Sequence, residues 1–125
     1  MLFRSLLHDA PEYVIGDMIS PFKAAIGSDY KRVEERLLAA IFIRFGLPAR
    51  MPPELYKPIK AADREAGYLE ATSLAGFAVA EARQFFGAPK LAPGAFALYL
   101  LPLRPSEAQE RFLARFAELD RAGGE

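Results

Sequence analysis

The residues best suited to chemistry are a histidine and an aspartate that stand side by side near the start of the chain, His8 and Asp9. A neutral imidazole and a carboxylate both bind divalent metal ions, and adjacent residues can bind one ion if the backbone turns between them. An exposed helix end explains such a pair equally well. His8 is the single histidine of the sequence, so a catalytic scheme that needs two histidines from this chain is excluded.

A second aspartate, Asp63, interrupts an apolar pattern. Apolar residues surround it at spacings of three and four, which is typical of one helix face: Tyr56, Ile59, Ala62, Ala66 and Leu69. A carboxylate on such a face costs free energy unless a cation, a metal ion or several donors satisfy it. One interpretation is a salt bridge to a neighbouring helix or a helix cap. The other is a third metal ligand beside His8 and Asp9, a set that suits manganese, iron, cobalt, nickel or zinc better than magnesium.

Three more charged side chains follow the histidine–aspartate pair, namely Glu12, Asp17 and Lys23. Carboxylates in a loop usually face solvent, and an isolated lysine is usually solvated as well. The functional alternative is that Glu12 and Asp17 hold a water molecule at the metal or accept its proton. Lys23 would then face an anionic substrate.

The elements that must position these residues are helices. No stretch alternates apolar and polar residues as a half-buried strand does, and β-branched residues are sparse. Prolines and glycines predict an irregular loop over residues 10–27, with a short helical turn after Pro21. We expect helices over 2–9, 28–45 and 106–122. Another should start in the Met51-Pro52-Pro53 cluster and run to about Leu74, continuing after a bend near Gly76 to Phe86. The predicted fold class is all-α, with residues 1–125 forming a single domain.

Composition excludes several classes of protein. A length of 125 residues fits one domain, and a formal net charge of zero argues against nucleic-acid binding. The absence of cysteine removes disulfides, zinc fingers and thiol nucleophiles. Apolar runs are too short for a membrane span, and the first residues are too short an apolar stretch for a secretory signal. We therefore expect a cytoplasmic protein.

Four linked segments resemble one family. They read HDAPE (8–12), GDMISPFK (16–23), YKRVE (30–34) and IKAAD (59–63), the last followed by Tyr68-Leu69. In this order they resemble the HD-domain metal-dependent phosphohydrolase superfamily, and its bacterial 5′-deoxynucleotidase-like branch most closely. The resemblance covers about residues 2–75, whereas residues 76–122 carry no recognised motif.

The resemblance implies a single HD-type helical domain and a role for each matching residue. His8, Asp9 and Asp63 would bind one divalent metal ion (Mn, Co, Fe, Ni, Zn or Mg). Glu12 would position or deprotonate the attacking water and Asp17 would assist near the phosphate, while Lys23 is a weaker candidate for a substrate contact. The implied reaction is hydrolysis of a phosphomonoester, such as a nucleoside monophosphate, through a metal-activated water.

The sequence departs from the family at its start. The family's metal set begins with another histidine on a preceding helix, and none of the seven residues before His8 is histidine. We therefore expect weak metal binding, because water must replace the missing ligand. We also expect Leu2, Phe3, Leu6 or Leu7 to be partly uncovered, which favours a homodimer or covering by the C-terminal segment.

Two other functions remain open at this point. The first is a degenerate HD domain with weak or no catalysis, which binds a nucleotide or a partner protein. The second is an all-α assembly protein that associates through the apolar stretch from Phe96 to Leu103.

Overall fold

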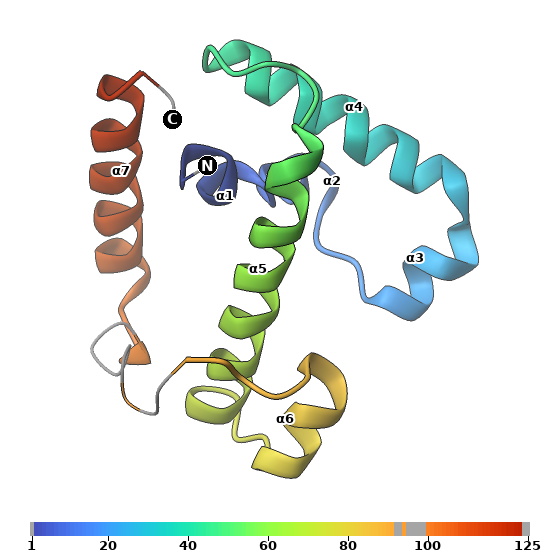
Figure 1. Cartoon of the computed structure of the whole chain (residues 1–125), viewed down its shortest axis with the longest axis vertical. Helices are drawn as coiled ribbons and strands as arrows, with labels where there is room; N and C mark the ends of the chain where they lie inside the picture. The colour runs from blue at the N-terminus through green and yellow to red at the C-terminus, as the bar shows by residue number, and fades with distance from the viewer. Residues whose placement is uncertain (1, 92–93, 95–99, 124–125) are drawn as a thin grey trace. The chain divides into compact units, whose positions relative to one another are not determined.

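The computed structural model describes residues 2–91, 94 and 100–123. Within these residues the regular elements are α-helices (Figure 1), and no strand is present. They are α1 (Leu2–Leu7), α2 (Ala10–Ile15), α3 (Ser20–Ile26), α4 (Ser28–Arg44), α5 (Pro53–Ser73), α6 (Val79–Phe86) and α7 (Pro105–Arg121). The all-α prediction is confirmed. None of the described helices is long and apolar enough to cross a membrane.

The chain divides into two compact units. The first unit consists of Met1–Pro52 together with Arg111–Glu125, and the second consists of Pro53–Glu110. Helix α7 contributes residues to both. The expectation of a single domain stays a prediction, and the stretch 95–99, where much of the expected assembly surface falls, lies outside the described residues.

The segment between α1 and α4 is more regular than the sequence predicts. Instead of a loop with one helical turn, it forms α2 and α3. Each of these helices has a proline in its first two positions, where the missing N–H group leaves no hydrogen bond unmade. Each ends at a glycine with positive φ, Gly16 at 81° and Gly27 at 82°. The residues that indicate a loop are therefore the boundaries of two short helices.

The core of the first unit lies around α1. Phe3 and Leu7 are buried against residues of α4, of the segment after it, and of α7: Phe42, Leu47 and Leu119. Phe116 of α7 adds a half-buried ring to the same core. Of the four residues expected to be partly uncovered (Leu2, Phe3, Leu6 or Leu7), Phe3 and Leu7 are therefore buried, because the C-terminal helix covers them, which is one of the two outcomes foreseen. Leu2 remains 49% exposed.

A buried arginine fixes α1 to the segment that follows α4. The Arg4 guanidinium donates a hydrogen bond from Nη2 to the carbonyl oxygen of Pro48 at 2.9 Å, and it lies over the Phe42 ring, 4.7 Å from the centroid. Arg4 is 2% exposed. This contact holds the helix that His8 follows, because Arg4 and His8 stand one turn apart in sequence.

The second unit is built on α5 and α6. Tyr68 and Ala71 of α5 pack with Ala82 of α6, and Phe86 joins them at the edge. Gly67 permits this close packing, since a Cβ atom there would lie 2.7 Å from Cε1 of Phe86. Helix α5 carries Asp63, so this packing supports the helix on which the third candidate ligand stands.

Candidate metal centre

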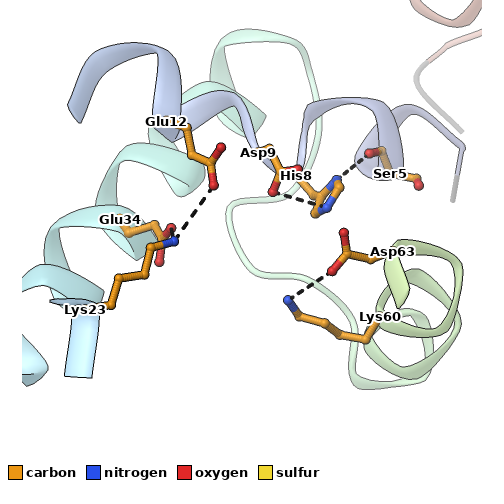
Figure 2. Close-up of polar contacts among 8 residues, drawn as sticks. All are labelled: Ser5, His8, Asp9, Glu12, Lys23, Glu34, Lys60 and Asp63. Atoms are coloured by element: carbon orange, nitrogen blue, oxygen red, sulfur yellow. Dashed lines mark hydrogen bonds and ion pairs between the residues drawn. The ribbon is translucent and has the colours of Figure 1, made fainter. Parts of the chain in front are cut away.

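His8 follows α1 directly, and a backbone carbonyl orients its ring. Its Nδ1 lies 2.7 Å from the carbonyl oxygen of Ser5 (Figure 2). A carbonyl oxygen only accepts, so Nδ1 is the donor. In the neutral ring the proton is then on Nδ1 and the lone pair is on Nε2. A metal-binding histidine typically donates its other N–H in this way.

The chain turns at Asp9, as the metal hypothesis requires. Asp9 precedes α2 with φ −95° and ψ 4°, a conformation that redirects the chain between two helices. Its carboxylate faces the imidazole, with Oδ1 3.2 Å from Nε2 of His8. The His8 side chain is 20% exposed and the Asp9 side chain 61% exposed, so solvent reaches the pair.

The pairing of these two atoms has a chemical consequence. When Nε2 carries a lone pair, it faces an ionised carboxylate oxygen, and two acceptors at this distance repel each other. Either a proton on Nε2 or a cation between the groups removes the repulsion. The pair is therefore a candidate metal-binding histidine–aspartate group.

Asp63 belongs to the second unit. Its carboxylate Oδ2 lies 3.8 Å from Nζ of Lys60, three residues earlier on α5, and its side chain is 39% exposed. Of the apolar face predicted around it, Ile59 is buried whereas Tyr56 is 57% exposed. The face is therefore narrower than the sequence indicates.

Glu12 stands on α2, one turn after His8, with its side chain 28% exposed. Burial raises the pKa of its carboxyl above the ordinary value of 4.5, and the negative charges of Asp9, Asp17 and Glu34 raise it further, while Lys23 lowers it. A carboxylate with a raised pKa is a better proton acceptor near neutral pH.

Lys23 and Asp17, the remaining predicted site residues, lie in the same unit. Nζ of Lys23 is 3.8 Å from Oε1 of Glu12 and 3.7 Å from Oε1 of Glu34 (Figure 2). Asp17 is exposed and follows Gly16, whose carbonyl oxygen accepts a hydrogen bond from the Tyr30 hydroxyl at 3.4 Å. The first unit thus gathers Glu12 and Lys23 into one network and places Asp17 on the turn after α2.

Sequence reasoning missed three contributors to this arrangement. The Ser5 carbonyl leaves no signal, because any residue supplies a backbone oxygen. Tyr30 and Glu34 do leave one. They are four residues apart, so they share one face of α4, and both fall in the segment YKRVE that carries the resemblance.

Comparison with known proteins gives relatives but no activity. No family model matches the chain. It is 51% identical over 113 residues to an uncharacterized protein of Rhodobacter capsulatus, and the aligned region covers 89% of this chain and 56% of that protein. It is 32% identical over 117 residues to the uncharacterized protein YfdR of Escherichia coli, and the aligned region covers 94% of this chain and 61% of YfdR. The chain therefore spans little more than half the length of these relatives.

Proposed function

We propose that this chain is a metal-dependent phosphohydrolase domain of the HD type. Its substrate is a small phosphomonoester in the cytoplasm, such as a nucleoside monophosphate. In this proposal His8, Asp9 and Asp63 would supply one ring nitrogen and two carboxylate oxygens to a single divalent ion. The proposal rests on the four segments that resemble this superfamily and on the geometry of the histidine–aspartate pair.

The single observation that carries the proposal is the orientation of His8. Its Nδ1 is committed to the Ser5 carbonyl at 2.7 Å, and its Nε2 faces Oδ1 of Asp9 at 3.2 Å. A ring held in this way offers its lone pair beside a carboxylate, and that donor set fits a borderline divalent ion such as manganese, cobalt, nickel or zinc.

The chain's own residues then divide the chemistry. When bound, the ion lowers the pKa of a water molecule and polarises a phosphoryl oxygen. Glu12 accepts the proton of the attacking water, and its raised pKa suits it to this role near neutral pH. Asp17, on the turn after α2, assists near the phosphate. Attack in line with the leaving group then releases phosphate and an alcohol.

A second candidate function is a degenerate domain that binds a nucleotide without turnover. The candidate ligand set favours it, because that set contains one histidine where the HD set uses more. In that case the metal or nucleotide binds and no phosphate is released.

The test pairs calorimetric metal titration with phosphate release from a panel of nucleoside monophosphates, with Mn²⁺, Co²⁺, Ni²⁺, Zn²⁺ and Mg²⁺ in turn. Asp63→Asn should lose metal affinity and turnover together. Asp29→Asn is the matched control, since Asp29 is 76% exposed and pairs with Arg32 on α4, and it should change neither. Turnover by Asp63→Asn at the wild-type rate would refute the ligand set.

Glu12→Gln separates metal binding from proton transfer. It should keep the metal affinity and lose rate by roughly 10²–10⁴-fold, the usual contribution of a general base. Metal binding without phosphate release from any substrate would favour the degenerate domain instead.

A further inference from the structure

One face of α4 supports both α2 and α3. Tyr30 and Glu34 stand one turn apart on this face. The Tyr30 ring is 9% exposed, and its hydroxyl donates to the carbonyl oxygen of Gly16 at the end of α2. Both α2 and α3 contact α4. The pair thus forms a platform beneath the two short helices, one of which carries Glu12.

Lys23 of α3 reaches across this platform. Its Nζ lies between two carboxylates, 3.8 Å from Glu12 and 3.7 Å from Glu34 (Figure 2), and 5.5 Å from the centroid of the Tyr30 ring. The three side chains of this ion-pair group are 28–32% exposed. By contrast, Lys31 and Glu35 form an ordinary surface pair on α4, with side chains 76% and 64% exposed.

We infer that Lys23 is a positioning residue, which holds the Glu12 carboxylate in place through the Tyr30–Glu34 platform, and that it does not bind the substrate. The inference rests on the proposed function only in assigning Glu12 a part in the reaction. The positioning contact itself does not depend on it. It revises the expectation that Lys23 contacts an anionic substrate.

The charges explain why one lysine has this effect. Glu12 and Glu34 are both within ion-pair distance of the same ammonium group, so their mutual repulsion is offset only while Lys23 stays between them. Without the ammonium group the two carboxylates repel each other, and the Glu12 side chain turns toward solvent. A substrate phosphate that contacts Lys23 would compete for the ammonium group with two carboxylates that already lie within 4 Å of it.

Kinetics distinguish positioning from substrate binding. Lys23→Met should lower kcat by about tenfold or more, within the range that a misplaced general base loses, and leave KM within about twofold. Lys23→Arg keeps the charge and should restore most of the rate. The control Lys31→Met makes the same chemical change on the exposed pair and should leave both constants unchanged. A raised KM with unchanged kcat in Lys23→Met would overturn the inference in favour of a substrate contact.

A double substitution gives the decisive comparison. In a Glu12→Gln background, Lys23→Met should lower the rate no further, because its effect passes through Glu12. If the double variant instead loses rate by the product of the two single-variant losses, the inference is overturned. If the wild-type chain hydrolyses nothing, the proposed function fails, and the urea midpoints of the same four proteins still decide the positioning claim. Non-additive shifts of the urea midpoint support the Lys23–Glu12 link. Strictly additive shifts overturn it.

Discussion

The ring of Phe3 in α1 meets the ring of Phe116 in α7 nearly edge to face, with centroids 5.2 Å apart and an interplanar angle of 69°. Phe45 at the end of α4 completes the cluster, 5.0 Å from Phe116. Aromatic pairs favour this geometry. The C-terminal segment therefore covers the helix that presents His8, and α1 needs no second copy of the chain to bury Phe3.

Removal of either ring should destabilise the protein to different degrees. Phe3 is fully buried, so Phe3→Ala should cost about 3–5 kcal/mol of unfolding free energy. Phe116→Ala should cost less, because that ring is only half-buried, and the two losses should couple by about 0.5–1.5 kcal/mol. The control Phe112→Ala, at a side chain 45% exposed on α7, should cost little. Urea denaturation checks this, and a harmless Phe116→Ala would show that α7 does not cover α1.

The fold class was readable from the sequence, whereas the shortest helices were not. The apolar positions Val33, Leu37, Ile41 and Phe45 recur every fourth residue and indicate α4 directly. Helices α2 and α3 are too short to show such a repeat. Their prolines and glycines are equally typical of loops, and only packing against α4 selects the helical form.

Some features of the candidate site could likewise be predicted from the sequence, and others could not. Residue type and adjacency indicate His8 and Asp9, because few pairs are such good ligands. What orients them is a Ser5 carbonyl, which no side-chain pattern encodes. The position of Lys23 between Glu12 and Glu34 depends on how three helices pack, so the sequence alone left the lysine as an isolated charge.

The tautomer of His8 is directly testable, because the chain has one histidine and its ring signals need no assignment. With Nδ1 donating to Ser5, long-range ¹H–¹⁵N spectra of the metal-free neutral ring should show the proton on Nδ1. Addition of Zn²⁺ should move the Nε2 resonance and leave Nδ1 protonated. A ring protonated on Nε2 when neutral would contradict the orientation on which the metal hypothesis depends.

The raised pKa of Glu12 makes stability depend on pH in a defined direction. The folded chain binds this proton more tightly than the unfolded chain, whose carboxyl titrates near 4.5. Glu12 therefore has no net effect on folding well below 4.5, and it destabilises the folded state increasingly as the pH rises through the window between 4.5 and the raised value. In EDTA, Glu12→Gln should be more stable than the wild type at pH 7, with a difference that disappears on acidification. A Glu12→Gln protein that is less stable at pH 7 would contradict the shift. Asp29→Asn, at an exposed carboxylate, is the control.

The buried guanidinium of Arg4 gives the sharpest test of how α1 is held. Within the described part of the chain, its Nη1 is buried without a hydrogen-bond partner, while Nη2 bonds Pro48 and the plane covers Phe42. A buried charge without a carboxylate partner is costly, so an apolar side chain of similar length offsets much of what is lost. Arg4→Met should therefore change the unfolding free energy by no more than about 1 kcal/mol, roughly one hydrogen bond.

Arg4→Ala also leaves a cavity beneath Phe42 and should cost about 2–4 kcal/mol. Thermal unfolding of both variants beside Arg32→Met, at an exposed arginine of α4, measures the difference. If Arg4→Met destabilises the protein as much as Arg4→Ala, the charge itself stabilises α1, and an unobserved anion or water must satisfy Nη1.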